Sequence, residues 1–415
     1  MGQCDKTHLK NIRLRLAPTI SRNMQLSLLV AAMAVPSQYS IADHTESHQL
    51  NKFMGAKKAA DLELLRRNEE VREAYDKFKK VTAVVWGNEA VVPSADIEVT
   101  YRDNLSQRSV VNYEHGTVKV ELAVSPTKAK YQDGVQQKMA GAVQATIVQP
   151  PDDRSIVEMA KQPEPPPSEG EPMLKGLVAG QDGKPLSPDK MDAFRKEQLK
   201  AVTQRDIEGS DGRKRTVFST EFKLVPDHIR IRAKKYRHMV DKNSVRHNIP
   251  AHLIYAIIET ESFFNPRAKS PVPAFGLMQL VPQTGARDAY RFLYARDKIV
   301  KDTYLYKPNN NIKLGVAYLH MLHFRYLKRI KDPVSRQWAA IAAYNTGVDN
   351  VMGSFAGQYS KKKFTNRWIW KGKALKKINK MNPEQVYQHL RKYLPYEETR
   401  EYIKKVRDRM HKYQT

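Results

Sequence analysis

The pattern of hydrophobic and polar positions changes along the chain. In the first half, apolar and polar residues alternate over several short stretches, which is typical of strands with one buried face. The turn at 114–116 contains Gly116 and predicts that two of these stretches form a hairpin. The predicted strands are 96–101, 109–113, 117–124, 173–178 and 217–224.

Helical patterns lie between and around these strands. Apolar residues recur at helical spacing among many charged ones over 51–86 and 188–203, and 128–149 follows a similar pattern. The proline-rich stretch 162–167 predicts a linker, because proline cannot continue a helix or a central strand. The first half therefore predicts an α+β module.

From Pro226 onward the pattern is helical. Predicted helices cover 229–246, 311–331 and 335–344, and Gly347 is suited to end the last of them. Another helix begins at Pro250, since proline is tolerated in a first turn, and we expect Pro266 to end it. The predicted fold class is an α+β N-terminal module followed by a mainly α-helical domain.

Residues 1–42 are typical of a signal peptide. A basic leader precedes a short apolar run, Leu26–Val35, and the small residues Ser40 and Ala42 follow at positions that a signal peptidase reads. The alternative is an uncleaved membrane anchor, although the apolar run is short for a bilayer. We expect the remainder to divide into an α+β domain over 43–225 and a helical domain over 226–415.

The composition limits the partners and cofactors. With 71 Lys and Arg against 44 Asp and Glu, the net charge of +27 predicts an anionic partner, whether nucleic acid, anionic lipid or an acidic polymer. The one cysteine, Cys4, excludes an internal disulfide and a cysteine-based metal set. The 12 histidines show no metal-ligand spacing and glycine-rich phosphate loops are absent, so we expect neither a metal nor a cofactor.

Glu261 is the candidate catalytic acid. Three isoleucines precede it on the same helical face, whereas Glu259 points roughly the opposite way. A carboxyl at the end of such an apolar face is poorly solvated, and desolvation raises its pKa, so it can protonate a glycosidic oxygen. The alternative is a helix-terminal Glu that caps its own turn or pairs with a Lys. The isoleucines are Ile254, Ile257 and Ile258.

Three motifs decide between these alternatives. In order and spacing they resemble the signatures of the lytic transglycosylase fold, which soluble lytic transglycosylases and goose-type lysozymes share. The resemblance implies a lysozyme-like catalytic domain over 226–415, with Glu261 as its acid. The motifs are Glu261-Ser262, Asn265-Pro266, Ser270 and Gly276-Leu277-Met278-Gln279; then Ala342-Ala343-Tyr344-Asn345-Thr346-Gly347; then Pro395, Glu398-Thr399-Arg400 and Tyr402.

The resemblance extends into the first half of the chain. Val84-Val85-Trp86-Gly87 and the hairpin residues 114–118 are similar to the N-terminal domain of the membrane-bound lytic murein transglycosylase C type, so the resemblance covers roughly residues 70 to 410. That type is a lipoprotein with a lipidated cysteine directly after its signal core. Here Cys4 precedes the apolar run instead. We therefore expect a soluble periplasmic enzyme, and contact with the outer membrane or with cell-wall proteins stays open.

The family resemblance also implies a mechanism with one acid, since the GLMQ and AYN segments hold no second carboxylate. Glu261 protonates the β-1,4 bond between N-acetylmuramic acid and N-acetylglucosamine in peptidoglycan. The muramic N-acetyl group stabilises the charge at C1, and Glu261 then deprotonates the C6 hydroxyl, which closes a 1,6-anhydro product without water. The implied partner is the peptidoglycan glycan strand, and no nucleic acid is expected.

The resemblance assigns supporting roles by position. Ser270 and Tyr344 are candidates to hydrogen-bond near the acid and the N-acetyl group, and Gln279 and Asn345 near sugar hydroxyls and amides. Glu398 holds the sugar or peptide on the far side, and Met278 offers apolar contact. Each has a structural alternative: Asn345 as a helix cap, Glu398 as an ion-pair partner of Arg400 or a nearby Lys, and Met278 as a core residue.

Two other functions compete with this prediction. One is a muramidase that uses water on the same fold, and the other is a non-catalytic protein that binds cell wall or nucleic acid. The absence of an evident second acid favours the transglycosylase over the muramidase. The intact Glu261, Gln279 and Tyr344 argue against a degenerate binding protein.

Overall fold

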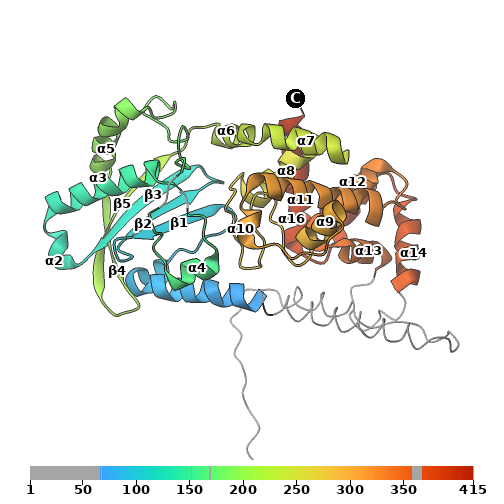
Figure 1. The fold of residues 1–415 in the computed structure, drawn as a ribbon, viewed down its shortest axis with the longest axis horizontal. Helices are drawn as coiled ribbons and strands as arrows, with labels where there is room; N and C mark the ends of the chain where they lie inside the picture. Colours follow the sequence, from blue (N-terminus) through green and yellow to red (C-terminus); the bar gives the residue numbers. More distant parts are fainter. Residues whose placement is uncertain (1–65, 67, 151, 168–169, 358–366, 415) are drawn as a thin grey trace, which may run out of the picture.

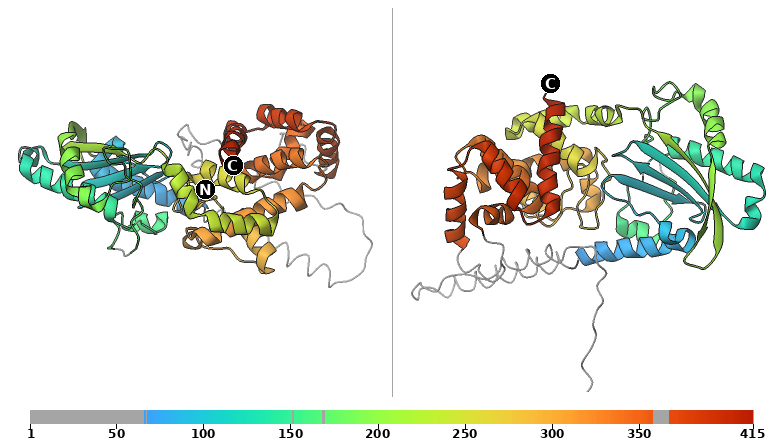
Figure 2. Two further views of the ribbon diagram at one scale, coloured as in Figure 1. Left: turned by 90° about the horizontal axis from the view of Figure 1, so that it is seen from above. Right: turned by 180° about the vertical axis from the view of Figure 1, so that it is seen from behind.

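The computed structural model describes residues 66, 68–150, 152–167, 170–357 and 367–414, so the predicted signal peptide at 1–42 lies outside the described residues. A part built on a β-sheet and a part built from helices lie side by side (Figures 1 and 2). Within the described ranges, no helix combines the length and the apolar character that crossing a bilayer requires.

The sheet has five antiparallel strands in the order β1-β2-β3-β5-β4. The predicted hairpin is confirmed: β2 and β3 pair with Val111 opposite Val118. β5 then pairs with β3, which places Val120 opposite Thr220. The strands are β1 (Ile97–Arg102), β2 (Gln107–Asn112), β3 (Thr117–Val124), β4 (Thr203–Glu208) and β5 (Lys214–Lys223).

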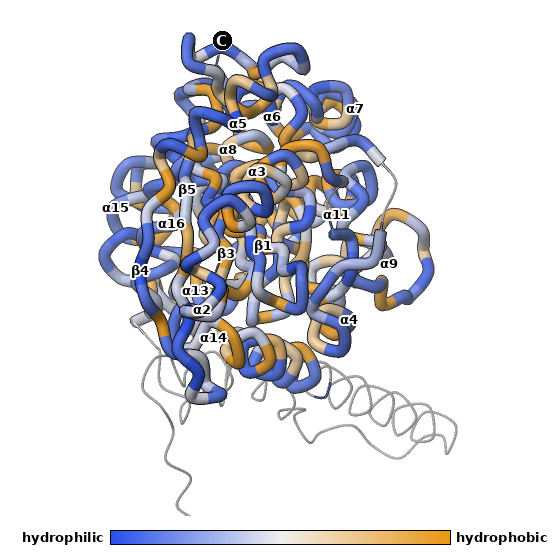
Figure 3. The backbone as a smooth tube through the Cα atoms, turned by 90° about the vertical axis from the view of Figure 1, so that its left-hand side faces the viewer, coloured by the Kyte–Doolittle hydropathy of each residue, from blue (hydrophilic) through white to orange (hydrophobic). Residues whose placement is uncertain are grey.

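Two strand predictions differ from the structure. The stretch 173–178 is a turn that contributes only the bridge between Val178 and Leu224, so the predicted strand is wrong there. β4 was not predicted, because it is an edge strand whose residues are mostly polar and exposed (Figure 3). Backbone pairing with β5, rather than an alternating side-chain pattern, makes it a strand.

Helices cover both faces of the sheet. On one face, Val120 and Phe222 pack with Met139 of α3 and Phe194 of α5. On the other, Tyr101 packs with residues of the helix over 68–86 and of α4. The predicted helices thus exist, with the part of 51–86 before residue 66 outside the described residues. The elements are α2 (Pro126–Ala129), α3 (Gln132–Val148), α4 (Ile156–Lys161), α5 (Met191–Lys200) and the short η2 (Gly87–Glu89) and η3 (Pro188–Lys190).

The second half is helical, as predicted. Its elements are α6 (His228–Lys235), α7 (Arg237–His247), α8 (Ala251–Ser262), α9 (Gly285–Tyr294), α10 (Asp302–Leu305), α11 (Pro308–Met321), η4 (Leu322–Tyr326), α12 (Pro333–Thr346), α13 (Val348–Ala356), α14 (Arg367–Ile378), α15 (Pro383–Tyr393), α16 (Glu397–Met410) and η5 (His411–Tyr413).

Helix boundaries differ from the prediction at three places. The predicted helix 229–246 breaks into α6 and α7 at Tyr236, and 311–331 leaves α-helical geometry after Met321 through the π-helical turn η4. α8 ends at Ser262 rather than at Pro266, because Phe263 takes a left-handed conformation with φ of 49°. Gly347 ends α12 as predicted, with φ of 85°.

α8 lies at the centre of the helical core. Its isoleucines at 254, 257 and 258 are all 0% exposed and pack in one cluster with residues of α11, α12 and α16. A helix that is apolar on nearly every side is stable only when other helices surround it. The functional side chains at its C-terminal end are therefore held on a rigid element.

Replacing Ile257 by Ala should lower the free energy of unfolding by about 2–5 kcal/mol, since the side chain is wholly buried and leaves a cavity in the helical core. Val245→Ala is the matched control. That side chain is 85% exposed, so the change should stay within about 0.5 kcal/mol. Urea unfolding followed by circular dichroism measures both. Equal effects of the two substitutions would contradict the central position of α8.

Candidate active site

The segment after α8 folds back onto the helix end. The hydroxyl of Ser262 is buried and donates to the carbonyl of Leu277 at 2.8 Å. Phe263 and Phe264 both take positive φ, of 49° and 61°, which turns the chain sharply after Ser262. Non-glycine residues rarely adopt this conformation, and they do so mainly where tertiary contacts enforce it. The two halves of the first motif are thus joined directly.

Asn311, at the start of α11, holds the loop at 275–279. Its side chain accepts from the Met278 N–H at 2.8 Å and donates to the carbonyls of Phe275 at 2.8 Å and Leu305 at 2.9 Å. It is 0% exposed, so these bonds have no competition from water. Sequence reasoning did not identify Asn311 as a site residue. The one available signal was a polar residue at the head of an apolar helix.

Gly276 allows Asn311 to come this close. Its φ is 74°, and a Cβ there would stand 2.4 Å from Asn311 Nδ2 and from the Leu305 carbonyl. No side chain fits without moving backbone, so this motif glycine is required by both its conformation and the space around it.

Tyr344 and Asn345 bring the second motif to the first and the third. The Tyr344 hydroxyl donates to the Met278 carbonyl at 2.8 Å. The Asn345 side-chain oxygen accepts from the Thr399 hydroxyl at 2.7 Å, so Asn345 links α12 to α16 and does not cap its own helix. The three motifs, distant in sequence, therefore meet at the end of α8.

Glu261 has the properties expected of a proton donor. Burial raises the pKa of its carboxyl to about 8, and the negative charge of Glu398 adds to the rise. The Tyr402 hydroxyl lies close enough to offset part of it. That hydroxyl is buried and has no hydrogen-bond partner of ordinary geometry among the described residues. Glu261 remains partly accessible, which a substrate-contacting group requires.

Glu259 shows what the neighbouring turn does with a carboxyl. It is 1% exposed and lies against the C-terminal end of the chain, 2.8 Å from Lys412 Nζ, 3.3 Å from Arg409 Nε and 2.7 Å from the Tyr413 hydroxyl. The expected opposite orientation of the two glutamates is confirmed. Glu259 is saturated by ion pairs and hydrogen bonds, whereas Glu261 has none of the ion pairs formed by the described residues.

The other predicted site residues differ in what they contact. Gln279, with φ of 42°, donates its amide N–H groups to the carbonyls of Gly276 at 3.0 Å and Ala268 at 3.2 Å. Its side-chain oxygen takes no donor from the described residues and can serve a ligand. Ser270 is partly exposed and makes no hydrogen bond within the described part of the chain. Its role stays a prediction.

Glu398 is exposed in the first turn of α16. The alternative partner Arg400 donates instead to the Leu394 carbonyl at 2.6 Å, and no ion pair involves Glu398 in the described ranges. The charge of Glu398 thus raises the pKa of Glu261, and the Glu398 carboxylate is available to a ligand.

The Met278 side chain lies in the core and not at the surface of the site. It is 0% exposed, and its side chain packs so closely on Gly315 of α11 that a Cβ there would meet the sulfur at 2.4 Å. The expectation that this side chain offers apolar contact to a ligand is not supported by such a position. Met278 instead acts through its backbone, which joins Asn311 and Tyr344.

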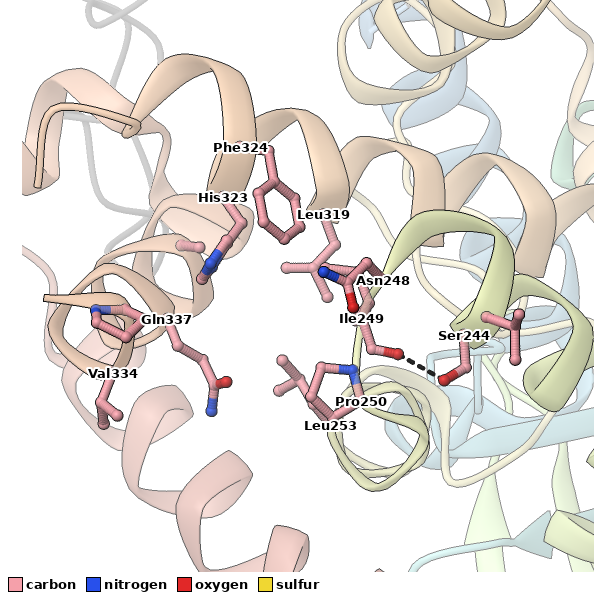
Figure 4. Close-up of a pocket in the computed structure, with 13 residues that line it drawn as sticks. Ser244, Asn248, Ile249, Pro250, Leu253, Leu319, His323, Phe324, Val334 and Gln337 are labelled. Carbon is pink, nitrogen blue, oxygen red and sulfur yellow. Dashed lines mark hydrogen bonds between the residues drawn. The ribbon is translucent and has the colours of Figure 1, made fainter. Parts of the chain in front are cut away.

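Possible metal ligands and a neighbouring cavity also bear on the extent of the site. The described residues contain no group of three or more His, Cys, Asp or Glu that could hold a metal ion. A cavity of about 530 Å³ lies at the N-terminal end of α8, lined among others by Asn248, Pro250 and His323 (Figure 4). None of the predicted site residues lines that cavity, so it is separate from the site around Glu261.

Comparison with known proteins agrees with this geometry. The family model "Transglycosylase SLT domain" matches residues 238–366, and the model "Membrane-bound lytic murein transglycosylase C, N-terminal domain" matches residues 63–235. The site and these matches define an enzyme of the lytic transglycosylase class. The chain belongs to the family of membrane-bound lytic murein transglycosylase C.

Two relatives of known family lead to the same assignment. The membrane-bound lytic murein transglycosylase C of Sodalis glossinidius is 32% identical over 323 residues, which cover 78% of this chain and 84% of the relative. That of Mannheimia succiniciproducens is 30% identical over 386 residues, 92% of this chain and 97% of the relative. Among solved structures, the 70 kDa soluble lytic transglycosylase of Escherichia coli is 26% identical, with a TM-score of 0.31 over 43% of this chain and 24% of that one.

Asn311→Ala should lower kcat by about tenfold or more, because two hydrogen bonds to the 275–279 loop and a third to the Leu305 carbonyl are lost, and a misplaced reacting group costs at least that much. Asn309→Ala, an exposed change on the same helix, is the control and should leave kcat unchanged. Turnover of purified peptidoglycan measures both. If the Asn311 variant is folded by circular dichroism and fully active, the loop does not depend on this residue.

Proposed function

We propose that this enzyme cleaves the β-1,4 bond between N-acetylmuramic acid and N-acetylglucosamine in peptidoglycan glycan strands and forms a 1,6-anhydromuramic acid end. The observation that carries the proposal is one desolvated carboxyl, that of Glu261, whose pKa is raised to about 8 within the meeting point of all three motifs. At neutral pH such a group is mostly protonated and can act as a general acid.

In the first step, the Glu261 carboxyl donates its proton to the glycosidic oxygen, and the bond from that oxygen to C1 breaks. The N-acetyl group of the muramic acid stabilises the positive charge that develops at C1. Tyr344 and Gln279 orient this sugar in the proposed reaction. Tyr344 is itself fixed through the Met278 carbonyl, and Gln279 through two loop carbonyls.

In the second step, the Glu261 carboxylate takes the proton of the C6 hydroxyl of the same sugar. The C6 oxygen then bonds to C1, so the proton balance closes without water and Glu261 is again protonated. Because the nucleophile belongs to the bound sugar, its effective concentration far exceeds that of a diffusing group. Burial around Glu261 supports the exclusion of competing water.

A water-using muramidase is the second candidate, and the position of Glu398 is the observation that favours it. Inverting glycosidases hold a second carboxylate that activates water across the scissile bond. Glu398 is exposed, carries no ion pair among the described residues and acts electrostatically on Glu261. We prefer the transglycosylase reaction because the chain belongs to a family of lytic transglycosylases.

We further propose a place in the cell for the enzyme. The relatives are named membrane-bound murein enzymes, and the leader at 1–42 has the pattern of an export signal, so the periplasm is the proposed location. We also propose the domain boundaries expected from sequence, 43–225 for the α+β domain and 226–415 for the catalytic domain. The first domain then borders the active-site loop.

Glu261→Gln should abolish release of 1,6-anhydromuropeptides from purified sacculi, with a loss of at least about 10³-fold, because the amide cannot donate or accept the proton. Mass spectrometry of the products is the measurement. The control is Glu397→Gln, an exposed neighbour of Glu398, which should release wild-type products. Products one water heavier from wild type would support the muramidase instead.

The pH dependence should follow Glu261. Because the carboxyl must be protonated to donate, kcat/KM should fall as the pH rises through about 8. Glu398→Gln removes a negative charge that raises this pKa, so the alkaline limb should move to lower pH. Glu397→Gln should leave the limb in place. An alkaline limb that does not move in the Glu398 variant would show that its charge does not reach the acid.

A further inference from the structure

A second cavity, of about 270 Å³, lies where the sheet part meets the helical part. Tyr113, from the turn after β2, lines it on one side, and Arg232 and Tyr236 at the α6–α7 junction line it on another. Phe264 and Arg267, from the segment after α8, line a third side. No part of the mechanism proposed above uses this cavity.

Arg232 is a buried cation without a counter-ion. It is 4% exposed, its Nη2 donates to the Tyr113 carbonyl at 3.1 Å, and its guanidinium lies 4.3 Å from the centre of the Tyr113 ring. Its Nε and Nη1 have no hydrogen-bond partner in the described ranges, and none of the ion pairs there includes it. Burial lowers the pKa of this guanidinium to about 10, which reflects the same lack of compensation.

Such an arrangement is unfavourable unless something completes it. Buried charges in proteins are normally paired, because desolvation costs more than a neutral hydrogen bond returns. The contact with the Tyr113 ring offsets only part of that cost. The missing component is an anion next to Arg232, and the adjoining cavity is the place that can hold it.

The remaining wall fits an anion that is carried on a partly apolar molecule. Lys235 lies exposed at the rim, and Arg267 forms an ion pair with Asp153. Among the described residues of the lining, the acidic side chain is Glu171, which is engaged by Lys175 at 3.4 Å. The aromatic rings of Tyr236 and Phe264 are stacked, with their centres 6.3 Å apart, and provide an apolar surface beside these charges.

We propose that this junction cavity is a binding site for a small oxyanion, a carboxylate or a phosphate, with Arg232 as its buried anchor and Lys235 as its rim contact. The stacked rings favour a carboxylate on a small organic body, such as a peptide end, over inorganic phosphate. An arginine that offers several N–H donors suits either oxyanion.

The cavity is separate from the reaction centre but mechanically close to it. Glu259 is the carboxylate of α8 whose charge reaches Arg232, but it is already engaged by Lys412, Arg409 and Tyr413, on the side of α8 away from Glu261. Phe264 follows Glu261 by three positions, so an occupant of the cavity would contact the segment that turns the chain back toward the active site.

The test uses the full chain and isothermal titration calorimetry with three probes. They are an N-acetylated L-alanyl-L-alanine dipeptide with a free carboxylate, its C-terminal amide, and inorganic phosphate. We expect the carboxylate form to bind and the amide not to bind. Binding of phosphate alone would assign the site to an inorganic oxyanion and support the anchor while removing the organic ligand.

Matched variants locate the binding. Arg232→Met should raise the Kd of the carboxylate probe by at least about tenfold. Lys235→Ala should raise it by about threefold, because that charge is exposed at the rim. Lys234→Ala is the control, because Lys234 is exposed on the same helix and does not line the cavity. Circular dichroism checks the fold of Arg232→Met, and the exposed Lys235 variant tests the proposal independently.

Three results would overturn the proposal. They are no binding of any anionic probe to wild type, equal binding of the carboxylate and the amide, and equal weakening by Lys234→Ala and Lys235→Ala. Because none of these probes is cleaved by the enzyme, their outcome is independent of the reaction proposed for Glu261.

Discussion

The chemistry of the helical part depends on the desolvation of one carboxyl at the end of a buried helix. α8 is surrounded by other helices, so a side chain at its C-terminal end loses water, and the pKa of Glu261 rises to about 8. The same helix carries Glu259 two residues earlier, where two cations and a tyrosine hydroxyl surround its carboxylate. Two identical side chains thus acquire different chemistry from their neighbours alone.

Hydrogen bonds from buried and half-buried residues hold the surroundings of Glu261 in place. Ser262 binds the carbonyl of Leu277, Asn311 binds backbone groups of Phe275, Met278 and Leu305, and Tyr344 binds the Met278 carbonyl. In a low-dielectric interior such bonds are strong and cannot be exchanged for water. The motif residues therefore serve two purposes, since several of them build the loop and leave a smaller number to face a ligand.

The sheet part contributes to the same region from outside. The backbone N–H of Lys269 donates to the Ser94 carbonyl at 3.4 Å, Arg267 pairs with Asp153, and Arg232 binds the Tyr113 carbonyl. Lys269 itself is 4% exposed and lies 4.9 Å from the Tyr306 ring. The loop between Glu261 and Gln279 is thus supported by both parts of the molecule, which gives the N-terminal module a physical role in positioning that loop.

Local periodicity and motif spacing were enough to predict the hairpin of β2 and β3, the helical second half, the end of α12 at Gly347 and the candidate acid. The sequence pattern did not determine β4, whose polar residues become a strand only by pairing with β5, or the end of α8, where contacts force Phe263 into a left-handed conformation. It also did not reveal Asn311, the burial of Met278 or the unpaired Arg232. Those properties arise from contacts between residues that are far apart in the chain, so no local pattern could indicate them.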